Sequence, residues 1–134
     1  MAVLKRESYP INSSHDVVSV RQKVREWAVE AGFSLVDQTK LVTAASELAR
    51  NIINYAGNGT MTLEYVNNAT RTGLRVTFED RGPGISDIET AMKDGYTTGG
   101  GLGLGLGGAK RLANEFEIES TPEQGTRVSI TRWR

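Results

Sequence analysis

The sequence contains no cysteine and a single histidine, His15. The lack of cysteine excludes disulfide frameworks, thiolate zinc sites and thiol catalysis, and one histidine excludes histidine-rich metal sites. No segment approaches the apolar length needed to span a bilayer, and the first fifteen residues lack the apolar run of a signal peptide. We therefore expect a soluble, cytoplasmic protein that does not enter the membrane.

The sequence also lacks net charge, because 16 lysines and arginines balance 16 aspartates and glutamates. A balanced chain has no global field that would attract nucleic acid or an anionic membrane surface, so any binding must come from a local site. With 134 residues the chain is long enough to bury a core without disulfides or a structural metal. We expect one domain over residues 1–134.

Two amphipathic helices are predicted in the first half of the chain. Residues 12–14 offer capping oxygens to a helix that Gly32 ends, and Ser34 caps a second helix that ends at Gly57. A strand over 3–11 precedes both. In the second helix, apolar residues recur at helical spacing and predict this buried stripe: Leu35, Leu41, Ala45, Leu48, Ile52 and Tyr55.

Alternating, β-rich segments predict the remaining strands at 60–66, 74–79, 116–120 and 126–133. Asn67, Asn68 and Gly73 favour a hairpin connection between the first two, and residues 122–125 favour a turn between the last two. The pattern breaks between 80 and 108, where we expect a turn, a short helix over 86–93 and a glycine run. A further helix is expected over 109–115. This order of elements predicts an α/β domain.

One side of the second predicted helix has three polar residues, Glu47, Asn51 and Asn54, at the edge between core and solvent. They are compatible with an ordinary solvated helix surface. They are also compatible with chemistry, because an asparagine oxygen suits Mg²⁺, which takes few protein ligands beside phosphates. Glu47, one turn away, would then receive a proton. The functional alternative requires a phosphate donor nearby.

Seven glycines between Gly99 and Gly108 could form such a phosphate site. Without Cβ atoms, backbone N–H groups approach phosphate oxygens closely, and a following helix adds its positive end. A flexible linker is the alternative, but linkers rarely interleave leucines as GLGLGLGG does. The P-loop sequence GxxxxGK[ST] is absent, which excludes a P-loop enzyme. The segment before the glycines, DGYTTGG, is not a predicted strand, which disfavours a dinucleotide-binding fold.

Asp80 ends a β-rich segment and is followed by the turn sequence RGPG. A carboxylate at a strand end beside such a turn has room for a flat ligand, although a simple exit turn would produce the same pattern.

Four motifs in this order, ELARN (47–51), DRGPG (80–84), GLGLG (101–105) and GT (125–126), resemble the N, G1, G2 and G3 boxes of the GHKL ATPase superfamily. The resemblance implies the Bergerat fold. That fold is an α+β two-layer sandwich with a mixed, mostly antiparallel sheet, helices on one face, and ATP beneath a lid, here about residues 86–100.

The resemblance also implies roles for individual residues. Asp80 would accept a hydrogen bond from the adenine amino group with support from Thr126, Asn51 would hold Mg²⁺, and Glu47 would activate the attacking hydroxyl. Many members have a basic or histidine residue shortly after the asparagine, whereas Asn54, Tyr55 and Ala56 stand here, so Arg50 or Lys110 is left to contact phosphate. The implied glycines are Gly82 and Gly84 for adenine, and Gly101, Gly103 and Gly105 for the phosphates.

The segments SELARN, DGYTTGG and KRLANEF resemble the switch serine/threonine kinases of the stressosome, the RsbT type. This resemblance implies phosphorylation of a STAS-domain partner and activation of a downstream phosphatase by contact. An anti-sigma factor kinase is the close alternative, and an ATP-gated binding switch that acts by sequestration is another. A histidine kinase is disfavoured, because His15 lies in a predicted capping segment and not in a dimerisation helix.

Overall fold

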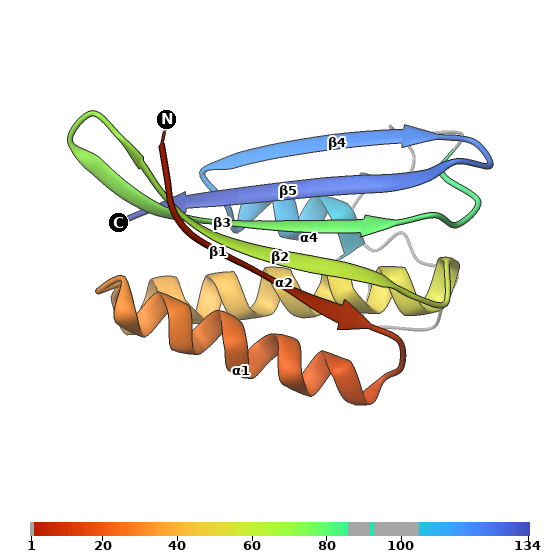
Figure 1. Cartoon of the computed structure of the whole chain (residues 1–134), viewed down its shortest axis with the longest axis horizontal. Coiled ribbons are helices and arrows are strands. Elements are labelled where there is room, and N and C mark those ends of the chain that lie inside the picture. Colours follow the sequence, from red (N-terminus) through yellow and green to blue (C-terminus); the bar gives the residue numbers. More distant parts are fainter. Residues whose placement is uncertain (1, 86–91, 93–104) are drawn as a thin grey trace.

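The computed structural model describes residues 2–85, 92 and 105–134. Two long helices, α1 (His15–Glu30) and α2 (Leu35–Tyr55), lie side by side across one face of a five-stranded sheet (Figure 1). The short helix α4 (Gly105–Arg111) packs against α2 on the same face. The strands are β1 (Ala2–Ile11), β2 (Gly59–Asn68), β3 (Arg71–Asp80), β4 (Glu115–Thr121) and β5 (Gly125–Trp133).

The sheet has the order β1-β2-β3-β5-β4, and each neighbouring pair is antiparallel. The predicted α+β sandwich with helices on one face is confirmed. The expected mixture of strand directions is not present among the described strands, where no parallel pair occurs. Antiparallel neighbours here are joined by tight turns or by a return through the helix layer.

The two faces of the sheet differ in chemistry because side chains alternate along each strand. The face toward the helices holds fully buried apolar residues such as Leu63, Val76 and Ile130. The opposite face, which no described helix covers, holds hydroxyl pairs; Thr77 and Ser129 lie 3.0 Å apart between their side-chain oxygens. By the same alternation, Asp80 and Thr126 fall on the face toward the helices.

The helix ends follow the sequence prediction in part. Ser34 caps α2 as predicted, since its Oγ accepts a hydrogen bond from the Asp37 amide at 3.2 Å. The glycines that end the helices have positive φ, +81° at Gly32 and +87° at Gly57. The predicted cap of α1 is wrong in its chemistry, because Ser14 makes no capping hydrogen bond. Instead the Asp16 carboxylate accepts from the amides of residues 12 and 13.

The predicted buried stripe of α2 holds for its central turns, where Leu41, Ala45, Leu48 and Ile52 are buried. It is wrong at the two ends of the helix. Leu35 is 71% exposed and Tyr55 is 41% exposed. They are the first and last residues of α2.

The connection between β2 and β3 is shorter than predicted. Asn67 and Asn68 pair within β2, and the turn consists of residues 69–70, with Ala69 at a φ of +53°. Gly73 lies inside β3, not in the turn. A Cβ atom at Gly73 would stand 2.7 Å from the Trp133 ring, so this glycine is required for packing of the indole and not for a turn.

Helix α4 begins four residues earlier than the predicted helix over 109–115 and ends at Arg111, and Glu115 already belongs to β4. Gly105, Gly107 and Gly108 are buried within α4, so part of the glycine run forms a helix that packs closely. The helix predicted over 86–93 and the lid predicted over 86–100 lie outside the described residues, apart from Met92. Within the described chain, no helix has the length and apolar character to cross a membrane.

Candidate nucleotide site

Three segments that are distant in the sequence meet at one end of the molecule (Figure 1): the C-terminal end of α2, the end of β3 and the β4–β5 turn. A Cβ atom at Gly82 would lie 2.6 Å from the Cβ of Ala56, the residue that caps α2. On the other side, the Glu123 amide donates to the Pro83 carbonyl at 2.6 Å. The loop after β3 is thus held between the helix layer and the β4–β5 turn.

Asp80, the last residue of β3, is half-buried at this junction. One of its two carboxylate oxygens accepts a hydrogen bond from the Gly82 amide at 2.9 Å, which fixes the orientation of the carboxylate. Thr126 is the residue opposite Asp80 in the β3–β5 register. The structure therefore brings together the two residues to which the family resemblance gives a role with adenine. The second carboxylate oxygen is the one that would accept from an amino group.

Gly82 and Gly84 are required by the fold itself. A Cβ at Gly84 would lie 2.2 Å from the Thr121 carbonyl oxygen, and its φ is +74°. At Gly82 the obstacle is the cap of α2. These contacts explain both glycines without a ligand, so their predicted role in adenine approach stays a prediction.

Glu47 and Asn51 occupy the same side of α2, one turn apart, and both are half-buried, whereas Asn54 is exposed. Glu47 Oε1 accepts a hydrogen bond from Arg50 Nη1 at 2.9 Å, and the Glu47 side chain is only 14% exposed. The guanidinium of Arg50, a predicted phosphate contact, is thus engaged with the predicted base. The ion pair with Arg50 orients that carboxylate at the edge of the helix.

The donor set suits Mg²⁺ better than a tightly caged metal. Among the described residues, no group of three or more histidine, aspartate or glutamate side chains could hold a metal ion. Asn51 offers a single neutral oxygen, which fits an ion that keeps waters and phosphate oxygens as its other ligands.

The glycine run is placed only in part. Gly105 is the first residue of α4, and α4 packs on α2, the helix that bears Glu47 and Asn51. Gly101 and Gly103 lie outside the described residues. Lys110 is exposed on α4. The described end of the glycine run therefore begins a helix that packs on α2, the helix of Glu47 and Asn51.

Sequence reasoning missed Ser120. Its hydroxyl oxygen lies 2.8 Å from the Thr126 hydroxyl and accepts a hydrogen bond from the Ile85 amide at 2.7 Å. The signal was present in β4, because Phe116, Ile118 and Ser120 share one face by alternation, and the last of them is polar. Its pairing with Thr126 becomes visible only in the register of β4 and β5.

A clasp ties the far end of α2 to β5 and to the chain after α4. Arg132 donates to the Asp37 carboxylate at 2.7 Å and to the Leu112 carbonyl at 3.0 Å. This hydrogen bond from Arg132 holds the pKa of Asp37 below its usual range. Arg132 Nε is buried without a partner in the described part of the chain, so the guanidinium is fixed by its other two nitrogens.

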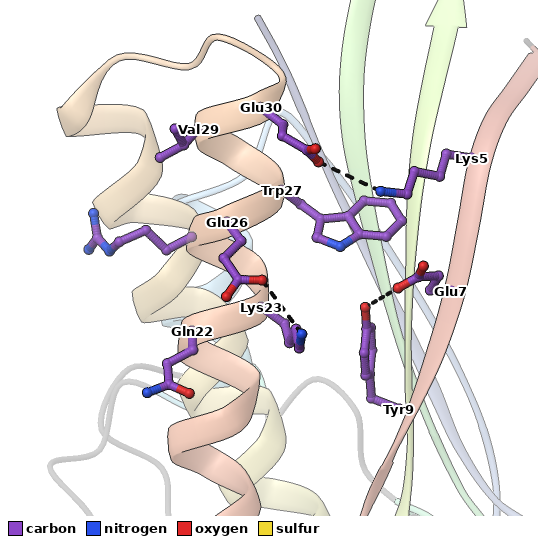
Figure 2. A pocket seen from close by; sticks show the side chains of 10 residues that line it. Lys5, Glu7, Tyr9, Gln22, Lys23, Glu26, Trp27, Val29 and Glu30 are labelled. Carbon is purple, nitrogen blue, oxygen red and sulfur yellow. Dashed lines mark hydrogen bonds and ion pairs between the residues drawn. The ribbon is translucent and has the colours of Figure 1, made fainter.

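A separate groove lies between β1 and α1, away from the β3 end (Figure 2). Four of its charged side chains form two ion pairs, Lys5 with Glu30 and Lys23 with Glu26, both at 3.6 Å. The groove is lined by Lys5, Glu7, Tyr9, Gln22, Lys23, Arg25, Glu26, Trp27, Val29 and Glu30.

Aromatic rings form the floor of this groove. Lys5 Nζ stands 4.4 Å from the centre of the Trp27 ring, and Tyr9 donates a hydrogen bond to Glu7 (Figure 2). Burial, followed by the hydrogen bond to Glu7, raises the pKa of Tyr9, and burial likewise raises the pKa of Tyr65, whose ring centre lies 4.6 Å from that of Trp27. The residues that line the groove include none from the motifs at 47–51, 80–84 and 125–126.

Comparison with known proteins identifies the family. The family model described as histidine kinase-, DNA gyrase B- and HSP90-like ATPase matches residues 36–133. The chain belongs to this ATPase family. The match spans the four motifs and the elements that bring them together, so membership in the GHKL superfamily is confirmed and ATP is its nucleotide.

Individual relatives narrow the class. This ATPase is 47% identical over 123 residues to the serine/threonine-protein kinase RsbT of Bacillus subtilis (strain 168), covering 92% of each chain. It is 29% identical over 128 residues to an anti-sigma F factor of Thermoanaerobacter sp. (strain X514), covering 92% of this chain and 89% of that one. The predicted resemblance to RsbT-type serine/threonine kinases is confirmed at the level of the family.

Two solved structures share the fold. The RsbU and RsbW domains of Rv1364c from Mycobacterium tuberculosis match with a TM-score of 0.65 and 20% identity, over 96% of this chain and 33% of that longer chain. The mycobacterial sensor histidine kinase MprB matches with a TM-score of 0.56 and 15% identity, over 96% and 97%. At these identities the likeness concerns the fold alone.

Proposed function

We propose that this ATPase acts as a serine/threonine protein kinase that phosphorylates a STAS-domain partner in a stress-signalling pathway. The observation that supports it most is the position of Glu47, a half-buried carboxylate one helical turn from Asn51 on the helix that ends against the Asp80 loop. The 47% identity to RsbT supports the same reaction class. Residues 1–134 would work as one domain in the cytoplasm.

In this proposal the protein contributes positioning and charge. Asp80 and Thr126 bind the adenine edge, and Asn51 holds Mg²⁺, which offsets negative charge on the phosphates when it is bound. Gly101, Gly103 and Gly105 would provide backbone amides to the phosphates. Glu47 orients the partner's hydroxyl and takes its proton as the hydroxyl oxygen bonds to the γ-phosphorus of ATP. At the same time the bond between that phosphorus and the β–γ bridging oxygen breaks, and ADP leaves.

Arg50 fits this scheme as the residue that orients Glu47. The side chain of Arg50 is 45% exposed, so the ion pair sits at the surface and is readily exchanged for another interaction. The Glu47 carboxylate would therefore be oriented by Arg50 in the free protein and could exchange that ion pair for a contact with a partner docked over α2.

We also propose a second partner, a downstream phosphatase. The kinase would activate this phosphatase by direct contact after it leaves its phosphorylated substrate. The relationship to an anti-sigma F factor supports a competing partner, a sigma factor bound in place of a STAS domain. Both versions use the same nucleotide site and differ only in the protein bound beside it.

The test is transfer of labelled phosphate from ATP with Mg²⁺ to a purified STAS-domain protein encoded near the gene of this chain. We expect label on a serine or threonine of the partner with the wild-type chain and none with Asp80→Asn. Nucleotide binding without transfer would point to a binding switch, and co-purification of a sigma factor would favour the anti-sigma alternative. Absence of ATP binding by the wild type would sink the proposed site altogether.

A further inference from the structure

Four large aliphatic side chains of α1 and α2 face solvent: Val18, Val29, Leu35 and Val36, each more than half exposed. The solvent side of an amphipathic helix normally carries polar residues, although a single exposed aliphatic residue needs no explanation. Three of the four gather in one place. Residues 31–34 join the last turn of α1, which contains Val29, to the first turn of α2, which contains Leu35 and Val36. We name these three residues the connection patch.

The helices do not need these side chains for their own stability. At the start of α2, Ser34 supplies the cap and Asp37 the acidic residue that favours a helix start. The buried residues of α2 begin only at Leu41, so the aliphatic residues of its first turn pack into no core. Figure 2 shows Val29 on the opposite side of α1 from the Trp27 ring. The connection patch is therefore open to a partner.

Two cations stand at the edge of the connection patch. Arg25, one turn before Val29, donates from Nη1 to the Gln38 side-chain oxygen at 3.2 Å, and this neutral acceptor does not compensate its charge. Lys40 follows Val36 by one turn of α2. Among the described residues, neither Arg25 nor Lys40 forms an ion pair with an acid.

The acidic residues of the same region are already paired. The Asp37 carboxylate accepts from Arg132 at 2.7 Å, and Glu30 lies 3.6 Å from the ammonium group of Lys5. The patch thus has an aliphatic centre and a basic edge. Its complement is a protein surface on which aliphatic side chains are flanked by aspartate and glutamate.

The connection patch is remote from the proposed phosphoryl transfer. Val36 precedes Glu47 by eleven positions, which is about 16 Å along α2. The α1–α2 connection and the β4–β5 turn lie at opposite ends of the molecule (Figure 1). A substrate hydroxyl has to reach Glu47, whereas a partner activated by contact alone has no such constraint. The position of the patch therefore favours the second partner over the substrate.

We propose that the connection patch, with Arg25 and Lys40 at its edge, is the docking surface for the partner that this kinase activates by contact. The partner binds it through an aliphatic surface flanked by acidic side chains. This inference rests on the second partner of the proposed function and not on the chemistry at Glu47. The kinase then uses different ends of α2 for its substrate and for its contact partner, so substitutions can separate the two outputs.

Val3 and Leu4 supply a matched control. They are also two adjacent, exposed aliphatic residues, but they belong to the edge strand β1 and not to the helix layer. The double variants Leu35→Ser/Val36→Ser and Val3→Ser/Leu4→Ser therefore remove the same side-chain types from two different surfaces. Arg6, an exposed cation of β1, is the corresponding charge control for Lys40.

The experiment uses the full chain, the purified phosphatase encoded near its gene, and the STAS-domain substrate. For each variant it measures the kinase concentration that half-activates the phosphatase, the KM and kcat of phosphoryl transfer, and the thermal unfolding midpoint. Leu35→Ser/Val36→Ser should raise the half-activating concentration at least about tenfold and leave transfer unchanged, because apolar anchors dominate an interface. Lys40→Gln should raise it about twofold to fivefold and weaken its dependence on salt. The two control variants should change neither output.

Unchanged activation by Leu35→Ser/Val36→Ser would refute the docking surface, and so would an equal loss in Val3→Ser/Leu4→Ser. A raised KM for the STAS domain would assign the connection patch to the substrate instead. A change from dimer to monomer in sedimentation, with activation unchanged, would assign it to a second copy of the chain. Either result overturns the inference.

The wild type separates this inference from the kinase reaction. A chain that transfers phosphate but does not activate the phosphatase overturns the inference and leaves the kinase standing, whereas activation without transfer overturns only the kinase. If the double variant does not fold, Val36→Ser alone decides the outcome by the same measurements.

Discussion

Two glutamate–arginine pairs in this molecule are alike in geometry and differ in position. Glu47–Arg50 on α2 and Glu64–Arg75 on the sheet face opposite the helices both have nitrogen–oxygen distances of 2.9 Å. Their glutamates are similarly enclosed, at 14% and 11% exposure. Only the first lies one turn from Asn51 on the helix that leads to the Asp80 loop. The proposed catalytic role of Glu47 therefore depends on its position beside Asn51, because its ion pair is the same as that of Glu64.

The largest expected effect is on the rate of phosphoryl transfer, and it should distinguish Glu47 from Glu64. Glu47→Gln should lower the rate of phosphoryl transfer about 10²- to 10⁴-fold while ATP affinity stays unchanged, because the amide cannot take the proton. Transfer is measured with labelled ATP and the STAS-domain partner, and affinity by calorimetry.

The matched variant is Glu64→Gln. It should leave transfer intact and lower the free energy of unfolding by about 1–3 kcal/mol, since a partly buried guanidinium loses its charged acceptor. Equal loss of transfer in both variants would show that the ion pairs act only through stability.

The second effect concerns two neighbouring acidic residues at the end of β3. Asp80→Asn should weaken ATP binding about 100-fold, because the amide can still accept from Gly82 but presents a donor to the adenine amino group. Glu79→Gln should leave binding unchanged, as Glu79 is exposed and its 3.6 Å pair with Arg127 lies on the other face. Binding titrations of both variants check this, and comparable affinities for the two would contradict the assignment of adenine to Asp80.

The third comparison uses two glycines with positive φ. Gly57 has φ +87° and open space where a Cβ would stand, whereas Gly84 has φ +74° and the Thr121 carbonyl oxygen at 2.2 Å. Gly57→Ala should cost about 1 kcal/mol of unfolding free energy from backbone strain alone. Gly84→Ala should cost more than about 2 kcal/mol and weaken ATP binding, because the loop must move away from β4. Chemical denaturation of both variants measures the difference, and equal costs would show that the Thr121 contact relaxes freely.

The last expected effect is a pH-dependent loss of stability that leaves phosphoryl transfer untouched. Because the pKa of Asp37 is lowered in the folded protein, its interaction with Arg132 stabilises the fold above the unfolded-state pKa and is lost as pH falls through the folded-state pKa. Asp37→Asn should therefore be less stable than wild type at neutral pH by about 1–3 kcal/mol. The difference should shrink below about pH 4.

Arg132→Met supplies the control for this clasp. The double variant should show little further loss beyond Arg132→Met, because that substitution already removes the interaction with Asp37. Unfolding curves between neutral pH and acid test both statements. A difference between wild type and Asp37→Asn that stays constant with pH would contradict the assigned ionisation.

The groove between β1 and α1 adds a contrast to the nucleotide end. Both contain charged residues beside aromatic or apolar ones, but in the groove Lys5 is paired with Glu30 and Lys23 with Glu26 (Figure 2). At the nucleotide end, the bond from the Gly82 amide is the one hydrogen bond to the Asp80 carboxylate within the part of the chain that the structure describes. This difference in pairing, more than the size of an opening, distinguishes the proposed site from the groove.

Much of the architecture could be read from the chain, because periodicity and caps are local signals. The alternation of β-rich segments predicted the strands, and Ser34 with Gly57 bounded α2 as expected. Errors arose where a residue's role depends on a distant partner. Gly73 suggested a turn but lies under the Trp133 ring, and Gly105 suggested a loop but begins α4.

The sequence by itself determined the residue types and their order: a carboxylate and an amide one turn apart on a helix, an aspartate at a strand end, glycines before a short helix and a threonine after a turn. Tertiary structure alone decided which of them meet. Strand register placed Thr126 opposite Asp80 and added Ser120, and packing of Gly82 against Ala56 brought that row to the end of α2. The reason is physical, because hydrogen-bond register and close packing join residues far apart in the chain, and no local pattern records those pairings.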